Sequence, residues 1–305
     1  MPEKRDESGR LPASANAPSD AAAPSHRLGV CSWSLQPAGT ADLIAKLQTC
    51  GISAVQLALE PIRAAHQGFE GGFEQVLAEL DEAGIEVISG MMEPVGEDYS
   101  TLESIQKTGG LRPDKYWQEN LNRAHELAEA CEEHGISLIT LHAGFLPEDE
   151  AHPLHRVMAD RIAQVAKVFG SRDVLVGLET GQERAETLLM LLDDIDEHML
   201  GVNFDPANML LYNMGEPDEA LAMLVDYVLQ VHIKDAVLTT APGSWGSEVP
   251  AGSGQVNWKR IFATITKELP HVDCVIEREA GTQRAADIVT ARKLLEAGLR
   301  GVSVE

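Results

Sequence analysis

Short apolar runs rich in β-branched residues alternate with longer amphipathic segments from residue 28 to about residue 300. This alternation is typical of βα units that build a parallel sheet. Eight strands are predicted, over residues 28–33, 54–59, 86–91, 137–142, 174–179, 200–205, 229–234 and 273–278. Because eight such units follow one another, the pattern predicts an α/β fold with a single closed (β/α)8 TIM barrel. A dinucleotide-binding sheet is disfavoured, since no Gly-x-Gly-x-x-Gly motif follows the first strand.

Amphipathic helices are predicted between the strands. The clearest cover residues 41–50, 73–84, 116–135, 183–195 and 284–298. Four of them end at a glycine, the residue that best adopts the left-handed conformation at a helix C-terminus. These glycines are Gly51, Gly84, Gly135 and Gly298.

The first 27 residues differ from the rest of the chain. They are rich in Ala, Ser, Pro and charged residues and show neither a strand period nor a helix period. Such a segment cannot bury enough apolar surface to order itself, so we expect residues 1–27 to be a flexible N-terminal tail. The barrel is then expected to occupy residues 28–305.

The seventh predicted strand carries a row of polar side chains. In VLQVHIKDA, residues 228–236, Gln230, His232 and Lys234 share one face. Strands that are covered on both faces are usually almost continuously apolar. In a TIM barrel the inward face of a strand leads to the mouth where active sites lie. We therefore expect His232 to mark the depth at which the packed interior gives way to a functional site.

Acidic residues end three other predicted strands. Glu179 follows VLVGL, Asp205 follows LGVNF and Glu277 follows DCVI. With His232, three carboxylates and one imidazole on four consecutive strands would share a narrow space. Unpaired carboxylates cannot do so unless their pKa values shift or a cation binds. The sequence therefore predicts a divalent-metal site with these four residues as ligands.

The ligand set of three oxygens and one nitrogen suits a hard or borderline ion. We expect one divalent metal, with Mn²⁺ favoured and Mg²⁺, Co²⁺ and Zn²⁺ as alternatives. The lack of thiolate ligands weakens the case for Zn²⁺. In the competing interpretation, Glu179 and Glu277 cap helices or pair with Arg184 and Arg278, and His232 is an ordinary core histidine.

Three further residues are candidates for substrate binding at the same mouth. Trp33 ends the first predicted strand and could form an apolar wall against a sugar face. His142 ends the fourth strand and could bind a hydroxyl, and Lys234 could balance the carboxylates or stabilise developing negative charge. Glu183 opens the predicted helix after the fifth strand, where an acid interacts favourably with the helix dipole.

From about residue 28 to 300 the chain resembles the xylose isomerase-like TIM-barrel superfamily of sugar phosphate isomerases and epimerases, which also contains abasic-site nucleases. The resemblance rests on LETGQE around Glu179, NFDPANM around Asp205, VHIKD around His232 and VIERE around Glu277. It implies that these four residues bind the metal. It also implies that Glu179 and Glu277 are catalytic acid/base groups on opposite faces of the substrate.

The resemblance implies a metal-dependent sugar isomerase or epimerase. A metal bound to a ketose carbonyl and its neighbouring hydroxyl acidifies the adjacent C–H and stabilises the enediolate. Return of the proton to the other face inverts a carbon, whereas return to the neighbouring carbon moves the carbonyl. Two alternatives stay open. One is a lyase, dehydratase or glycoside-cleaving enzyme acting on a cyclic polyol or keto-sugar, and the other is a non-catalytic sugar-binding barrel.

The chain also departs from relatives in this superfamily. Many of the epimerases carry a substrate-contacting histidine three residues after the strand-six aspartate, and Asn208 takes that position here as a candidate substrate-binding residue. The nucleases need that histidine and a later Asp-x-His pair, which HIKDAVLTTAPGSWG lacks. Xylose isomerase itself uses two metals, for which the region after strand seven offers only Asp235 and Glu248.

Composition narrows the choice of partners. The net charge of −24 disfavours nucleic acid and anionic membrane surfaces. No apolar run is long enough to span a bilayer, the N-terminus lacks a signal-peptide core, and four scattered cysteines fit a reducing compartment. We therefore expect a cytoplasmic protein with a small-molecule sugar or polyol substrate, and a homo-oligomer stays open. Substrate choice is expected to lie in loops 61–72, 93–115 and 236–257, the last a mobile lid or rim.

Overall fold

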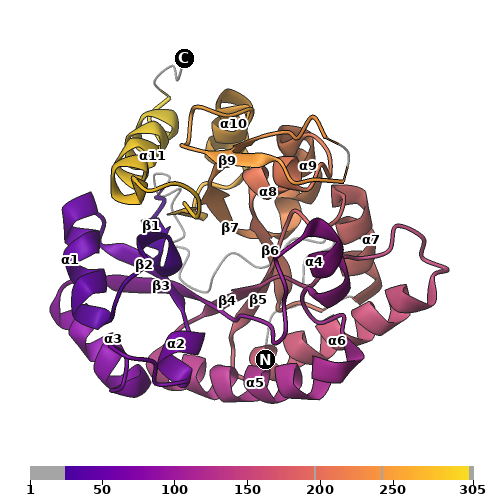
Figure 1. Ribbon diagram of the computed structural model, residues 1–305, viewed down its shortest axis with the longest axis horizontal. Coiled ribbons are helices and arrows are strands. Elements are labelled where there is room, and N and C mark those ends of the chain that lie inside the picture. The colour runs from indigo at the N-terminus through magenta and orange to yellow at the C-terminus, as the bar shows by residue number, and fades with distance from the viewer. Residues whose placement is uncertain (1–24, 196, 242, 302–305) are drawn as a thin grey trace, which may run out of the picture.

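The computed structural model describes residues 25–195, 197–241 and 243–301. Within them, eight parallel strands close into a barrel in the order β1-β10-β7-β6-β5-β4-β3-β2 (Figure 1). The strands are β1 (Leu28–Cys31), β2 (Ala54–Ala58), β3 (Glu86–Met91), β4 (Leu138–Leu141), β5 (Leu175–Glu179), β6 (Leu200–Phe204), β7 (Val228–Ile233) and β10 (Asp273–Ile276). All eight predicted strands are confirmed, and their ends differ from the predicted ends by no more than two residues.

Helices surround the strands and cover their outer faces (Figure 1). The main helices are α1 (Thr40–Cys50), α3 (Gly72–Glu82), α5 (Asp114–His134), α6 (Pro153–Gly170), α7 (Ala185–Ile195), α9 (Pro217–Leu224), α10 (Trp258–Glu268) and α11 (Arg284–Leu299). Shorter helical segments are η1 (Ser32–Leu35), α2 (Glu60–Arg63), α4 (Leu102–Thr108), α8 (Pro206–Leu211) and η2 (Val225–Tyr227). The five helices predicted most clearly are confirmed. None of the helices in the described residues has the length and apolarity that crossing a membrane requires.

Three of the four glycines predicted at helix ends have the left-handed backbone conformation. The φ angles of Gly51, Gly84 and Gly135 are 64°, 70° and 73°. The prediction for Gly298 is wrong, because α11 continues to Leu299. A Cβ atom at Gly298 would lie 2.2 Å from the ring of Phe262. This glycine is therefore required for the close packing of α11 on α10.

The inside of the barrel holds both apolar and polar side chains. Cys31, Ala54, Ile88 and Val275 form a small apolar cluster there, separate from the large core between strands and helices. Along β7, Gln230 is fully buried, as are the side chains that follow it on the inward face. The predicted polar row thus lies inside the barrel.

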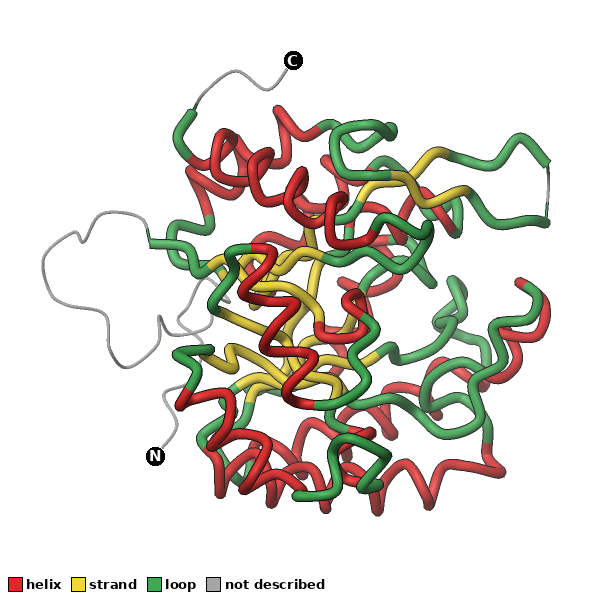
Figure 2. The backbone as a smooth tube through the Cα atoms, turned by 60° about the vertical axis from the view of Figure 1, so that its left-hand side comes forward, coloured by secondary structure: helices red, strands yellow, loops and turns green. Residues whose placement is uncertain are grey.

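The segment 236–257 contains a hairpin, where the sequence predicted a lid or rim loop. β8 (Asp235–Val237) pairs antiparallel with β9 (Ser247–Val249), and the hairpin projects from the barrel at the upper right of Figure 2. Asp235 organises its base. Its carboxylate accepts hydrogen bonds from the backbone N–H groups of Ala236, Gly252, Gly254 and Val256 and from the Trp258 indole. Asp235 is therefore not available as a ligand for a second metal.

Residues 25–27, the end of the predicted tail, run beside β10. The N–H of Cys274 donates to the carbonyl of Arg27 over 3.0 Å, and the Arg27 guanidinium pairs with Asp273 and Glu86. These contacts begin the packing of the barrel a few residues before β1. The rest of the predicted tail, residues 1–24, lies outside the described residues, so its flexibility stays a prediction.

Candidate metal centre

A belt of hydrogen-bonded polar side chains crosses the inside of the barrel. Gln56 donates from Nε2 to Thr140 Oγ1 (2.7 Å) and accepts at Oε1 from Gln230 Nε2 (3.0 Å). Gln230 also accepts from Ser89 Oγ (2.7 Å) and donates to Asn203 Oδ1 (3.2 Å). All five side chains are fully buried. Because each is satisfied by its neighbours, the belt is a rigid platform beneath the mouth.

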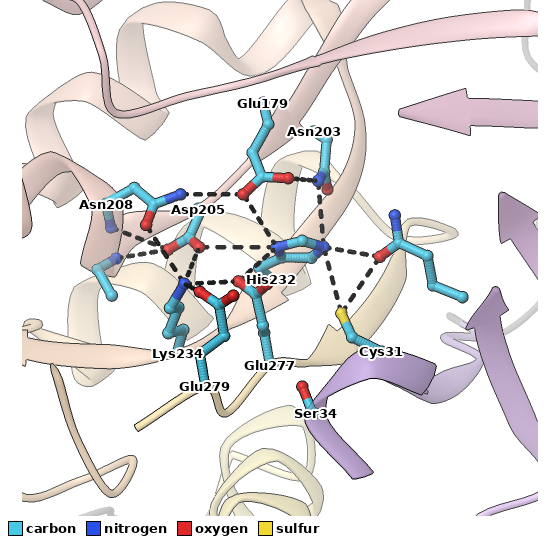
Figure 3. Close-up of polar contacts among 12 residues, drawn as sticks. Cys31, Ser34, Glu179, Asn203, Asp205, Asn208, His232, Lys234, Glu277 and Glu279 are labelled. Carbon is cyan, nitrogen blue, oxygen red and sulfur yellow. Dashed lines mark hydrogen bonds and ion pairs between the residues drawn. The ribbon is translucent and has the colours of Figure 1, made fainter. Parts of the chain in front are cut away.

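The four predicted ligands meet directly above this belt (Figure 3). One ligand atom from each of Glu179, Asp205, His232 and Glu277 lies within 4.8 Å of the others, and all four residues are buried. They come from the ends of β5, β6, β7 and β10, which are neighbours in the barrel. Parallel strands in register therefore bring residues that are far apart in the sequence to one point.

Among the described residues, neither glutamate of the cluster pairs with the arginines of the competing interpretation, and the ion pair of Glu277 is with Lys234 instead. Arg184 lies near Glu186, and Arg278 pairs with Glu248 and Asp287. Glu248 also accepts hydrogen bonds from the backbone N–H groups of residues 279 and 280. The pairing of Glu248 removes the last carboxylate that a second metal in this loop would need.

Two atoms in the cluster have no hydrogen bond within the described residues. They are Nδ1 of His232 and Oδ2 of Asp205, both buried and 3.6 Å apart. Nδ1 also lies 3.3 Å from Oε2 of Glu277 and 3.8 Å from Oε1 of Glu179. Leaving such atoms unsatisfied costs about 1–3 kcal/mol each. A divalent cation among them would satisfy both atoms, so the residues fit a metal ion.

The tautomer of His232 agrees with this fit. Its Nε2 donates to the amide oxygen of Gln56 over 2.8 Å, and an amide oxygen can only accept. Burial alone would lower the pKa of His232, but the acidic groups of Cys31, Glu179 and Glu277 hold it well above its usual value. A bound ion would take the place of the Nδ1 proton, and the lone pair of Nδ1 would then face the ion. This is the arrangement in which neutral histidine binds a metal.

Lys234 divides the cluster electrostatically. Its Nζ lies 2.8 Å from Oε2 of both Glu277 and Glu279. Burial alone would lower the pKa of Lys234, but Glu277 and Glu279 hold it well above its usual value. Burial alone would raise the pKa of Glu277, but Lys234 and His232 hold it well below its usual value. Burial raises the pKa of Glu179, and a nearby cation would oppose that shift.

A cavity of about 560 Å³ opens above the cluster. This volume is in the range of small-molecule sites. The charged residues that line it are Glu93, Glu97, Glu179, Glu277, Glu279 and Lys234. Carboxylates therefore dominate its lining.

The four residues predicted to bind substrate all line this cavity. Trp33 donates from Nε1 to Oε1 of Glu277 over 2.7 Å, and Asn208 donates from Nδ2 to Oε1 of Glu179 over 2.9 Å. Nε2 of His142 lies 3.4 Å from the same Glu179 oxygen. The structure thus brings the predicted substrate residues, Lys234 included, into contact with the predicted ligands.

Other residues of the site escaped the sequence reasoning. Gln56 interrupts an apolar strand in the way that Gln230 does, so the same argument would have found it. Glu97, Tyr99 and Tyr212 line the cavity from segments between strands, where no periodic pattern indicates which way a side chain points.

Two further buried titratable groups lie near the proposed ligands. Cys31 forms a second possible metal-binding group with His232 and Glu277. Burial raises the pKa of the Cys31 thiol far above its usual value, so it lies 3.7 Å from Nε2 of His232 as a protonated thiol. The sequence predicts that Glu183 opens the helix after the fifth strand, but it lies before α7 and is buried. Burial raises the pKa of Glu183 to about 8, so a charged interaction with the helix dipole is not its role.

Comparison with known proteins agrees with this geometry. A family model described as xylose isomerase-like TIM barrel matches residues 44–298. Among curated proteins, the uncharacterized protein YihM of Escherichia coli is 27% identical over 125 residues, which are 40% of this chain and 36% of YihM. The chain thus spans about a third of the length of that relative.

Solved structures share the fold over nearly the whole chain. A xylose isomerase domain protein from Planctomyces limnophilus is 28% identical with a TM-score of 0.79, covering 92% of this chain and 98% of that chain. The 3-keto-D-glucoside 4-epimerase YcjR from E. coli is 15% identical with a TM-score of 0.66, covering 90% and 100%. A xylose isomerase-like TIM-barrel protein from Mycobacterium smegmatis in complex with magnesium is 14% identical with a TM-score of 0.64, covering 88% and 92%. The likeness to the last two shows the fold alone.

Proposed function

The chain belongs to the xylose isomerase-like TIM-barrel family, and from this premise we propose that it is a divalent-metal-dependent sugar isomerase or epimerase. The observation that carries the proposal is the convergence of three carboxylates and one imidazole nitrogen on one buried point, where two of the atoms lack hydrogen bonds within the described residues. The substrate we propose is a small keto-sugar or related polyol in the cavity above them.

Glu179, Asp205, His232 and Glu277 would hold the ion. Three oxygens and one nitrogen favour Mn²⁺, with Mg²⁺, Co²⁺ and Zn²⁺ as alternatives. A divalent ion in this place polarises a carbonyl and its neighbouring hydroxyl, which acidifies the C–H bond beside them.

We propose that Glu179 and Glu277 transfer the proton. Their carboxylates lie on opposite sides of the His232 ring in Figure 3. Oxygens of Glu179 accept from Asn203 Nδ2 (3.2 Å) and from Asn208, and those of Glu277 accept from Trp33 and Lys234. Two donors hold each carboxylate in place before substrate binds, so binding does not have to fix the position of either glutamate.

The positions of the glutamates set the two outcomes of the proposed reaction. One glutamate removes the proton from carbon, and its return from the other side inverts that carbon. Its return to the neighbouring carbon moves the carbonyl group instead. His142, which lines the cavity 3.4 Å from Glu179, would bind a substrate hydroxyl on that side.

Metal titration and isotope exchange together test the proposal. Protein stripped of metal should bind one equivalent of Mn²⁺ in calorimetry. In D₂O the metal-loaded protein should then catalyse deuterium incorporation at a single carbon of at least one sugar from a panel of ketoses and keto-sugars. Without metal, no deuterium should be incorporated. The absence of stoichiometric metal binding would refute the site. Metal binding without exchange into any sugar would refute proton-transfer catalysis, and loss of water from the substrate would identify a dehydratase instead.

A further inference from the structure

A second cavity of about 550 Å³ lies beside the central one, between the segments that follow β1 and β2. We call it the side cavity. Its floor is apolar and buried and consists of Leu43, Leu57 and Phe69. Exposed polar side chains, among them Gln36 and Gln67, form its rim. An apolar floor with a few polar groups at the edge is typical of a small-molecule site.

Trp33 connects the two cavities, because it lines both of them. Its indole N–H donates to Oε1 of Glu277 over 2.7 Å, which fixes the ring in the wall between them. A group bound in the side cavity would therefore lie one indole ring away from a proposed metal ligand. This distance suits two linked parts of one molecule.

The walls of the side cavity are held in place by close backbone contacts. The N–H of Thr40 donates to the carbonyl of Gly68 over 3.2 Å, and a Cβ atom on Gly68 would lie 2.1 Å from the carbonyl oxygen of Ala38. Gln36 and Ala65, both with φ of 48°, are non-glycine residues in the left-handed region. Such strained residues cluster at binding and catalytic sites. The segments after β1 and β2 are thus locked together, and the cavity is formed before any ligand arrives.

We propose that the side cavity is a subsite for the second ring of a neutral glycoside whose first ring lies over the metal centre. The placement of the first ring rests on the function proposed above. The residues that line the side cavity include no Asp, Glu, Lys or Arg, and His66 is the one titratable side chain among them. Trp33 and Phe69 supply aromatic side chains to the lining for the C–H face of a sugar ring, while Gln36 and Gln67 can bond its hydroxyls at the rim.

The central cavity supports the neutral character of this ligand. Carboxylates outnumber the single lysine in its lining, and Lys234 is already paired with two of them. A phosphate group would meet repulsion from the nearby glutamates. A neutral two-ring glycoside matches the charge of both cavity linings, whereas a sugar phosphate matches neither.

Substitution of Ala38 provides the test, since this exposed residue lines the side cavity and is far from the proposed ligands in the sequence. In Ala38→Trp the new ring would fill the subsite. Ala45→Trp is the matched control, because Ala45 is exposed on α1 and does not line the cavity. Calorimetry on the full chain with Mn²⁺ would compare glucose with cellobiose, maltose, lactose, sucrose and trehalose.

At least one disaccharide should bind to the unmodified protein about tenfold more tightly than glucose, a gain that roughly two buried methylene groups provide. Ala38→Trp should abolish this gain and leave glucose affinity unchanged, while Ala45→Trp should keep it. The subsite is refuted if no disaccharide exceeds glucose, if the gain survives in Ala38→Trp, or if that variant weakens glucose equally.

The disaccharide affinities test the subsite independently of the proposed catalytic function. A disaccharide gain that Ala38→Trp removes would establish the subsite even if no deuterium exchange were found. Conversely, exchange into a monosaccharide without any disaccharide gain would support the function and refute the subsite.

Discussion

Replacing Gln56 by leucine should weaken Mn²⁺ binding by about 10- to 100-fold, although this glutamine is not a proposed ligand. Its amide oxygen accepts the Nε2 proton of His232 over 2.8 Å. Without that acceptor the proton is left buried and unpaired. The ring then gains by moving its proton to Nδ1, which removes the lone pair that would face the ion.

The magnitude follows from the cost of the lost hydrogen bond. A buried donor without a partner costs about 1–3 kcal/mol. A 10- to 100-fold loss of affinity corresponds to roughly 1.4–2.7 kcal/mol, which is the same range. Gln56 also bonds Thr140 and Gln230, so the variant should in addition lose some stability.

A control within the same belt separates metal affinity from stability. Ser89→Ala removes the 2.7 Å hydrogen bond to Gln230 and leaves His232 untouched. Competition against a fluorescent chelator would measure the Mn²⁺ affinity of both variants, and circular dichroism would confirm that both are folded. Unchanged affinity in Gln56→Leu, or an equal loss in Ser89→Ala, would refute the role assigned to Gln56.

Three further predictions test other parts of the site. Glu277→Gln should lower kcat by at least ~100-fold, whereas Glu86→Gln, the same change at the exposed start of β3, should not; near-normal turnover in Glu277→Gln would contradict its role. Glu183 has a pKa raised to about 8 by burial, so the folded state holds its proton more tightly than the unfolded state. The free energy of unfolding therefore falls as pH rises from the unfolded pKa through the folded pKa, by roughly 1.4 kcal/mol for each pH unit between them. Urea unfolding should show that the stability of Glu183→Gln rises relative to that of the unmodified protein between about pH 5 and pH 9. A stability difference that does not change with pH would refute this. Finally, fructose 6-phosphate should bind more weakly than fructose at low salt, and the difference should shrink as salt screens the glutamates; tighter binding of the phosphate would show that the carboxylate lining does not set selectivity.

The barrel and the ligand cluster could be predicted from the sequence because both depend on strands. Each strand appears as an apolar run with a period of two, and the barrel fixes where the strands end relative to one another. Glu179 and Asp205 each come at the end of such a run, so knowledge of the fold was enough to bring them together. No information about loops was needed for that step.

Features that depend on contacts between elements could not be predicted in this way. Gly298 has the residue type of a helix end, but the approach of Phe262 from another helix explains it. Asp235 follows a strand end as the proposed ligands do, yet backbone N–H groups of the following segment already occupy its carboxylate. In both cases the residue type fits two roles, and only the position of a distant segment decides between them.

Lys234 shows the same limit inside the site itself. Alternation places it on the inward face of its strand, where the structure has it buried. Its partner Glu279 comes from the segment after β10, where no periodic pattern applies. Nζ lies 2.8 Å from oxygens of Glu277 and Glu279 and 3.7 Å from Oδ2 of Asp205, so the lysine balances two carboxylates inside the proposed ligand set and one outside it. Glu179 is the proposed carboxylate ligand that Lys234 does not pair with, and the share of the lysine's charge that Glu279 takes is decided by a segment whose position the strand pattern does not encode.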